Sequence, residues 1–374
     1  MANQKQDWQG DVVIVGAGQA GCAAAYDLAC AGLSVCLLDR YLDTSHKPCA
    51  GGVTEKARRL YRFPLDSVIR EQVSALQMSL WLRRETRFAA ASPVCVMTHR
   101  PELDALCRQQ AERVGTLFRQ IKGLSGLHYE ADGVLLQTRE GDLRCRWLIG
   151  ADGANSTVRR LAFGGGAGSG GMAIEGLLAR EHCSHYPPTR FDFGVVKDGY
   201  GWLFPKGDHV NVGLYIRRAR DAVVTRNALA DYARRRLGSD ALTNVQGFPL
   251  GTWAHQRLAA AGRVLLVGDA AGFVEPLLGE GIYGAVLSGQ YAAAAILSGQ
   301  DQSAEAVVAT YLNDIERWRR ELAGIHPLAA VFYKTLPLSY GALYHAVRRP
   351  LMDGAAEGLT LGQSKRRFFG AHFS

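Results

Sequence analysis

The order of apolar and polar positions predicts that the chain opens with a strand, a glycine-rich turn and a helix. Residues 11–15 (DVVIV) form a short, β-branched apolar run that is typical of a buried strand. Glycines follow at 16–21, and the alanine-rich stretch 22–33 predicts a helix. A second buried strand is expected at 34–38. Together these elements form a βαβ unit, which predicts an α/β fold with a parallel sheet.

Strand patterns dominate the middle of the chain and helical patterns its end. The run from 189 to 217 alternates in the manner of an antiparallel sheet, and its last two strands are joined by a turn at 205–208. The other predicted helices are 101–114, 227–237, a helix starting near Gly281, and most of the chain after 300; the other predicted strands are 133–140, 143–152, 241–252 and 263–272.

Composition and charge narrow the class of protein. Hydrophobic residues make up 48% and charged residues 21%, which excludes a disordered or fibrous chain. The net charge of +8 suits an anionic cofactor, an acidic substrate or a membrane surface. Basic residues are not interleaved with aromatic ones, so we expect no nucleic-acid partner. Histidines and cysteines do not cluster in a metal-binding pattern, so we expect no metal.

The cysteines and the N-terminal sequence bear on location. None of the eight cysteines forms a C-x-x-C pair, and residues 1–11 contain no apolar segment of the secretory kind. No stretch reaches about 18 uncharged apolar residues, the length needed to span a bilayer. We therefore expect a cytoplasmic protein with free thiols, either fully in solution or associated peripherally with a membrane.

The first motif with chemical meaning is Gly16-x-Gly18-x-x-Gly21, placed between strand and helix. In this context the first glycine permits a tight turn, the second admits a pyrophosphate, and the third lets helix and strand pack closely. Asp39 closes the next strand, near the spacing expected of a carboxylate that binds ribose hydroxyls. The motif predicts a dinucleotide on the helix N-terminus.

A second glycine-rich stretch favours a flavin. In RVLLVGDAAGFVEPLLGEGIYGA, a strand ends at Asp269, whose carboxylate can bind a polyol hydroxyl. Gly279, Gly281 and Ile282 begin a new helix, and its backbone N–H groups can stabilise a ring carbonyl that becomes anionic on reduction. We therefore expect FAD.

Residues 150–156 (GADGANS) resemble the second strand-end fingerprint of FAD-dependent oxidoreductases with the p-hydroxybenzoate hydroxylase fold. The resemblance spans about residues 10–290. It implies that Arg100 lies near the FAD pyrophosphate, although a surface arginine at a helix start is the alternative. The expected cofactor-binding residues are Gly16, Gly18, Gly21, Asp39, Arg40, Arg100, Asp152, Asp269, Gly279, Gly281 and Ile282.

Within that class, the chain is most similar to the geranylgeranyl reductase family. Residues 47–52 (KPCAGG) resemble the family's KPCGG-type loop, with Ala50 where a glycine is common, and Tyr200–Lys206 resembles its Y-x-W-x-F-P-K hairpin. The resemblance implies an enzyme that reduces C=C bonds in isoprenoid chains with FAD. The external electron donor is expected to be NAD(P)H or a ferredoxin, and the substrate an apolar small molecule or lipid.

Three residues are candidates for the reacting site. Trp202 and Phe204 share one face of a strand and can form a wall for the flavin or an apolar substrate, although ordinary core aromatics are the alternative. Cys49 lies in a glycine-rich loop and can act as a proton donor or positioning group, or be an inert small residue.

Other functions fit the same fold. A flavin monooxygenase or halogenase is the first alternative, and a non-redox, flavin-binding isomerase or cyclase is the second.

The chain exceeds the roughly 250–300 residues at which single cores divide, so we expect two interleaved domains. The FAD-binding domain is predicted at 1–75, 97–165 and 255–300, and the antiparallel substrate domain at 76–96 and 166–254, with a glycine-rich connection at 164–171. Residues 301–374 form a C-terminal helical segment. Residues 326–352 of this segment are mostly apolar and include Arg348 and Arg349. We expect them to line an apolar passage or to touch a membrane; the alternative is that they pack on the core.

Overall fold

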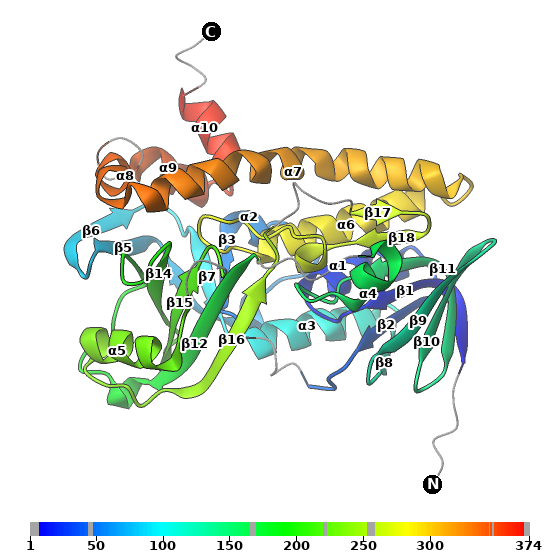
Figure 1. The fold of residues 1–374 in the computed structure, drawn as a ribbon, viewed down its shortest axis with the longest axis horizontal. Coiled ribbons are helices and arrows are strands. Elements are labelled where there is room, and N and C mark those ends of the chain that lie inside the picture. The colour runs from blue at the N-terminus through cyan, green and yellow to red at the C-terminus, as the bar shows by residue number, and fades with distance from the viewer. Residues whose placement is uncertain are drawn as a thin grey trace.

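The computed structural model describes residues 7–43, 48–164, 170–219, 223–252, 259–343, 345 and 348–369. Two large sheets lie side by side, and one long helix, α7, runs past both of them (Figure 1). The fold is α/β, as predicted.

The first sheet contains the predicted βαβ unit. Its strand order is β17-β18-β11-β1-β2-β8, and β10 pairs with β11 and with β9. Strands β11, β1, β2 and β8 run parallel. The bounds are β1 (Trp8–Val15), β2 (Val35–Asp39), β8 (Leu117–Gln120), β9 (Leu124–Glu130), β10 (Gly133–Thr138), β11 (Asp142–Gly150), β17 (Ala260–Ala261) and β18 (Val264–Leu266). The apolar run at 12–15 is buried at the centre of this sheet, because both of its faces are covered.

Small residues allow the helices beside this sheet to pack closely. A Cβ on Gly289 of α6 would come within 2.3 Å of the Ala20 carbonyl oxygen of α1. The helices of this region are α1 (Gln19–Cys30), α2 (Glu55–Arg58), α3 (Arg100–Arg113), α4 (Thr157–Phe163) and α6 (Ile282–Ser298), and the short 3₁₀ helices of the chain are η1 (Asp66–Val68), η2 (Arg180–His182) and η4 (Gly268–Ala270).

The second sheet has the order β16-β12-β15-β14-β13-β5-β6. The predicted hairpin is confirmed: β14 and β15 pair antiparallel, with Tyr200 opposite Tyr215. The bounds are β5 (Ala75–Leu80), β6 (Arg83–Ala89), β12 (Gly171–Ala179), β13 (Arg190–Phe193), β14 (Gly199–Pro205), β15 (His209–Ile216) and β16 (Thr243–Leu250). The expectation of a wholly antiparallel sheet is wrong at one pairing, since β13 runs parallel to β5. These two strands come from separate segments of the chain, so no hairpin imposes their direction.

Side-chain alternation gives the second sheet two different faces. Val210, Val212 and Leu214 of β15 point to helix α5 (Arg226–Leu237) and pack with its Leu229 and Tyr232. The residues between them point the other way, toward the first sheet and the α7–α8 region. This opposite side, here called the cavity face, carries most of the aromatic residues of the sheet.

Several elements differ from the sequence-based expectation. The strand expected at 263–272 ends at Leu266, because the chain turns into η4, and the first strand of the 189–217 run ends at Phe193. A third sheet, with the order β3-β7-β4, was not predicted; its strands are β3 (Gly52–Thr54), β4 (Ile69–Val73) and β7 (Cys95–Thr98). Most of the glycine-rich connection at 164–171 lies outside the described residues, and the domain boundaries stay a prediction.

The described part of the C-terminal segment is mainly helical. Its helices are α7 (Ala304–Lys334), α8 (Leu336–Ala342), α9 (Arg348–Ala356) and α10 (Leu361–Phe369). Within 326–352, Tyr333, Leu336 and Tyr340 are buried against the aromatic cluster of the second sheet. Leu328 and Leu338 are exposed. Packing on the core therefore describes part of this segment, and an apolar passage or membrane contact stays a prediction. Among the described residues, no helix combines the length and apolar character needed to span a bilayer.

Candidate flavin and substrate site

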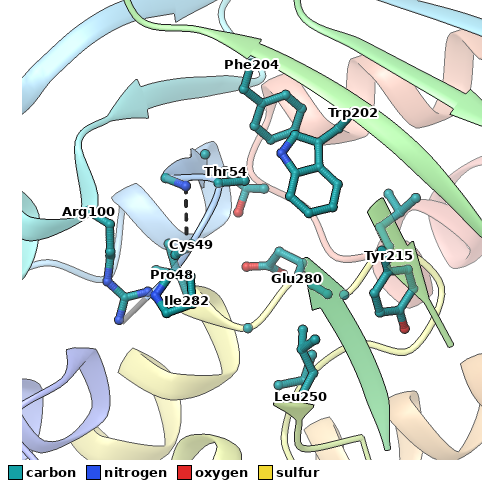
Figure 2. Close-up of a pocket in the computed structure, with 18 of the residues that line it drawn as sticks. Pro48, Cys49, Thr54, Arg100, Trp202, Phe204, Tyr215, Leu250, Glu280 and Ile282 are labelled. Carbon is teal, nitrogen blue, oxygen red and sulfur yellow. Dashed lines mark hydrogen bonds between the residues drawn. The ribbon is translucent and has the colours of Figure 1, made fainter. Parts of the chain in front are cut away.

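A cavity of about 340 Å³ lies between the glycine-rich turn of the first sheet and the cavity face of the second sheet. The turn at 18–20, the loop at 48–52 and the helix start at 279–282 contribute to its walls. Figure 2 shows Trp202 and Phe204 reaching into this space from their strand, opposite Cys49 and Ile282. The cavity is therefore continuous from the predicted cofactor turn to an aromatic wall.

The three glycines of the first motif have different surroundings. A Cβ on Gly16, whose φ is +108°, would come within 2.3 Å of the Ala151 carbonyl oxygen. A Cβ on Gly21 would come within 1.9 Å of the Gly16 carbonyl oxygen. A Cβ on Gly18 would meet no protein atom within 4 Å and would project into the cavity that Gly18 lines. Gly16 and Gly21 are required by backbone packing, whereas Gly18 leaves space for a ligand.

Asp39 and Arg40 lie outside the cavity lining. The Ala17 backbone N–H donates to Asp39 Oδ2 at 2.7 Å, so this carboxylate holds the glycine-rich turn from behind. The guanidinium of Arg40 lies over the Tyr41 ring, 5.8 Å from its centroid. Contact of either side chain with a cofactor ribose stays a prediction.

Arg100 is buried, which excludes the alternative of a surface arginine. Its Nε donates to Asp104 Oδ2 at 2.8 Å, and Gln19 Nε2 donates to the other carboxylate oxygen at 2.5 Å. Both Arg100 and Gln19 line the cavity. Asp104 therefore fixes a cation beside the helix that begins at the glycine-rich turn, where a pyrophosphate is expected.

Asp152 serves as a local structural anchor. It accepts hydrogen bonds from Ser156 Oγ at 2.5 Å and from the Thr157 and Val158 N–H groups at 2.6 and 3.1 Å, and so caps α4. Its neighbours Ala151 and Gly153 line the cavity, but Asp152 does not. The carboxylate shapes the turn, and a direct contact with cofactor stays a prediction.

The segment from η4 to α6 forms one wall of the cavity. Asp269, Gly279, Gly281 and Ile282 all line it, and Gly281 is the residue that precedes the helix. Glu275 holds the loop between η4 and α6, because its carboxylate accepts hydrogen bonds from the N–H groups of Leu277 and Leu278 at 2.5 and 2.9 Å. Burial raises the pKa of Glu275 to about 7. The positive end of the α6 dipole therefore faces the cavity.

The loop of Cys49 is held in place by the predicted hairpin. The Gly51 N–H donates to Cys49 Sγ at 3.4 Å, the contact dashed in Figure 2. Lys206 Nζ donates to the Ala50 carbonyl oxygen at 2.7 Å and also to that of Thr98. Cys49 lines the cavity and is partly buried. Lys47, part of the same motif, lies outside the described residues.

Trp202 and Phe204 are core residues that also line the cavity, and their contact with a flavin or substrate stays a prediction. Each is nearly fully buried within the aromatic cluster, and each lines the cavity. The indole Nε1–H of Trp202 donates to Asn211 Oδ1 at 2.7 Å, which fixes the ring plane. The phenyl ring of Phe204 packs edge-on against Phe191, with centroids 5.4 Å apart. Both rings are therefore held by contacts with neighbouring side chains.

The sequence analysis missed polar groups in this cavity. Glu175 lines it from β12, a strand that was not predicted, although its sequence GMAIEGLLA contains a single acid in an apolar run. Thr54 and Thr189 also line it, and the buried hydroxyl oxygen of each has no hydrogen-bond partner.

The residues present fit a bound FAD. Side chains are absent at Gly18 and Gly153, which both line the cavity and have open space where a Cβ would stand. The N-terminal ends of α1 and α6 face the same space, where their backbone N–H groups favour anionic groups. The orphaned hydroxyl of Thr54 leaves a donor for a ligand atom. Among the described residues, no three His, Cys, Asp or Glu side chains converge as a metal site.

Comparisons with known proteins agree with this geometry. Residues 9–189 match the family model for an FAD binding domain. The chain is 30% identical to a chloroplastic geranylgeranyl diphosphate reductase of Oryza sativa subsp. japonica, over 92% of this chain and 78% of the rice protein. This chain belongs to the geranylgeranyl reductase family. It is an FAD-dependent oxidoreductase of that kind.

Other members and solved structures extend the likeness. A digeranylgeranylglycerophospholipid reductase 2 of Methanothermobacter thermautotrophicus is 32% identical, over 83% of this chain and 84% of that protein. A geranylgeranyl bacteriochlorophyll reductase-like structure from Thermoplasma acidophilum superimposes with a TM-score of 0.78 at 21% identity, covering 98% of each chain. The p-nitrophenol 4-monooxygenase of Pseudomonas putida has a TM-score of 0.73 at 18% identity, covering 93% of this chain and 97% of its own. These two structures support the fold of this geranylgeranyl reductase family member.

Proposed function

We propose that this protein reduces carbon–carbon double bonds in the isoprenoid chain of a lipid or lipid precursor. The observation that carries the proposal is the continuity of the cavity: the glycine-rich turn forms one part, and the aromatic cavity face forms the other. The named relatives act on geranylgeranyl-bearing molecules, whose chains are apolar and unsaturated. A cavity walled by Trp202, Phe204 and Phe191 suits such a chain.

In this proposal, the place of each residue in the cavity determines whether it binds the cofactor or the substrate. Gly18, Arg100 and the α6 helix start would hold FAD, which supplies a hydride when it is bound in reduced form. Trp202 and Phe204 would orient the alkene and exclude water. Cys49, on the opposite wall, would position the reacting carbon atoms or contribute to proton delivery.

The electron donor in this proposal is NAD(P)H or a ferredoxin that binds transiently. Steady-state turnover rates measured with each donor, compared at the same fraction of reduced flavin, distinguish NAD(P)H from a ferredoxin.

Contact with a membrane surface forms part of the same proposal, since an isoprenoid lipid is delivered from a bilayer. Leu328, Val331 and Leu338 are 56, 58 and 78% exposed on the outer side of α7 and α8. Apolar side chains exposed together on a helix surface suit insertion into the interface of a bilayer.

Anaerobic reduction of the FAD-loaded enzyme with dithionite, followed by addition of a polyprenyl substrate, tests the reaction. Flavin reoxidation together with a gain of two hydrogens in the lipid supports alkene reduction. Reoxidation only when oxygen is admitted, with oxygen or halogen in the product, indicates a monooxygenase or halogenase instead. Product formation without net electron consumption indicates the non-redox alternative.

A further inference from the structure

The cavity face of the second sheet carries one acidic side chain among its aromatic residues. Strand pairing places Glu175 opposite Gly213, Gly213 opposite Trp202, and Trp202 opposite Phe191. Residues paired in this way point to the same side of a sheet, so these positions form one row across the cavity face. Gly213 has no side chain, which leaves Glu175 and the Trp202 indole as neighbours across it.

The indole and the carboxyl share a polar neighbour. Trp202 Nε1–H donates to Asn211 Oδ1, and the Asn211 amide lies close enough to the Glu175 carboxyl to lower its pKa. The backbone of Cys49 also lies near this carboxyl and lowers its pKa. Glu175 therefore lies where the aromatic wall meets the Cys49 loop, at the junction of the substrate and cofactor parts of the cavity.

We propose that Glu175 is the general acid of this enzyme, the group that protonates the substrate alkene, with Cys49 positioning the reacting carbons. This assignment rests on the proposed function, because it requires that an alkene be reduced. A carboxylic acid gives up a proton more readily than a thiol does, which favours Glu175 over Cys49 for this step.

The step balances in atoms and electrons. The π bond of the substrate breaks; one carbon receives a hydride, which carries the two electrons contributed by reduced flavin. The neighbouring carbon receives the proton that leaves the Glu175 carboxyl oxygen. The products are a saturated bond, oxidised flavin and a Glu175 carboxylate. Gln246, opposite Glu175 on β16, is exposed, so solvent lies one strand away for reprotonation.

The charged groups around Glu175 suit both of its protonation states. Burial raises the pKa of the Glu175 carboxyl, which keeps the acid protonated closer to neutral pH, although Lys206 and Arg100 and the nearby groups of Cys49 and Asn211 oppose the shift. Burial lowers the pKa of Lys206 to about 8. An ammonium group at Lys206 stabilises the carboxylate once the proton has left.

The substitution Glu175→Gln removes the acid but keeps the shape of the side chain. We expect this variant to bind FAD and melt like the wild type, while reoxidation of its reduced flavin by a polyprenyl substrate slows by about 10²-fold or more. The wild-type rate should fall as pH rises through the Glu175 pKa, and the rate of the variant should not follow that profile. Glu175→Asp retains an acid and should recover part of the rate with its pH dependence.

The protonation of Glu175 can be followed without cofactor or turnover. A group with a raised pKa in the folded state contributes stability that is present below its unfolded pKa and is lost as pH rises through its folded pKa. The free energy of unfolding of the wild type should therefore fall, relative to Glu175→Gln, as pH rises from about 4. A carboxylic acid band in the infrared spectrum should disappear over the same range in the wild type and be absent from the variant.

Glu71→Gln is the matched control, because Glu71 is also a glutamate whose pKa burial raises, but it lies on β4 outside the cavity lining. Its rate and pH profile should equal those of the wild type. If Glu175→Gln reoxidises at the wild-type rate with the wild-type profile, the assignment of Glu175 is wrong and the proposed function stands. If the wild-type flavin is not reoxidised by any polyprenyl alkene, both the assignment of Glu175 and the proposed function are wrong.

Discussion

The indole ring of Trp202 occupies the space where a side chain on Gly213 would stand. A Cβ on Gly213 would come within 1.9 Å of the indole Cζ2. The ring can therefore lie across β15 and donate to Asn211, two residues along the same strand. The absence of a side chain at Gly213 thus determines the orientation of the aromatic wall.

Gly213→Ala should displace this ring. We expect the variant to lose about 1–3 kcal/mol of unfolding free energy, because a methyl group overpacks the wall, and to reoxidise more slowly with substrate. Urea denaturation and anaerobic stopped-flow absorbance measure the two effects. Gly247→Ala is the control, since a Cβ there would meet only the Ala173 carbonyl oxygen at 3.7 Å. Equal stability of the two variants would contradict this account of the ring.

Gly18→Val should abolish FAD binding but preserve the fold. The valine side chain would fill space that the cofactor pyrophosphate needs, yet its Cβ would meet no protein atom within 4 Å. Flavin absorbance of the purified protein and circular dichroism measure binding and folding separately. Gly21→Val provides the contrast: it should destabilise the protein itself, because a Cβ at that position collides with the Gly16 backbone. Retention of flavin by Gly18→Val would refute the assignment.

Cys49→Ala should leave the FAD content unchanged and slow flavin reoxidation by the alkene. The expected effect is smaller than that of Glu175→Gln, since Cys49 positions the substrate in our proposal. Product analysis should also detect a change in which double bond is reduced first. Cys30→Ala, at an exposed cysteine, is the control. Kinetics identical to the wild type would make Cys49 an inert small residue.

Glu275 should make the stability of the loop before α6 depend on pH. Its folded pKa of about 7 is raised by burial, so the stability that it contributes is present below its unfolded pKa and lost as pH rises through 7. Relative to Glu275→Gln, the wild type should lose roughly 3 kcal/mol of unfolding free energy between about pH 4 and 8. Urea titrations across this range measure the difference.

The control for that titration is Glu181→Gln, at an exposed glutamate. The difference in unfolding free energy between Glu181→Gln and the wild type should stay constant with pH, whereas the difference for Glu275→Gln should change. Parallel stability curves for the wild type and Glu275→Gln would show that the buried carboxyl does not hold its proton.

The exposed apolar side chains of α7 and α8 should bind anionic vesicles. Replacement of Leu328, Val331 and Leu338 by glutamine should weaken flotation with liposomes at low salt by about tenfold or more, and leave thermal stability unchanged. Val223→Gln, at another strongly exposed apolar residue outside these helices, is the control. If the wild type does not float with liposomes, membrane contact is not part of its function.

Short sequence patterns correctly predicted those helices, strands and turns whose signals lie within one continuous stretch of the chain. The buried run at 12–15, the glycines after it and the helix that follows are encoded within about thirty residues, and the structure places them as expected. The β14–β15 hairpin was equally accessible, because its turn and its alternation are both local. The three-stranded sheet was missed because its strands are only three to five residues long, and β12 was missed although it is an apolar run with a single acid.

The chemistry of the site depended more on distant pairings. Asp39 and Asp152 follow the strand-end pattern of cofactor ligands, but in the structure both hold backbone turns. Glu175 has no motif around it; its significance arises only when β12 lies two strands away from β14.

The class of cofactor could be inferred from local sequence, because a glycine-rich turn between a strand and a helix fixes its own backbone geometry. Local sequence also indicated the family, through motifs whose residues are contiguous. Which polar groups share the cavity with Trp202 depends on how distant strands and loops pack against one another. Strand pairing and loop packing together bring residues as far apart as Cys49, Glu175 and Lys206 into one place. Burial then shifts the pKa values of Glu175 and Lys206 in opposite directions. Neither the pairing nor the desolvation is encoded in any short segment.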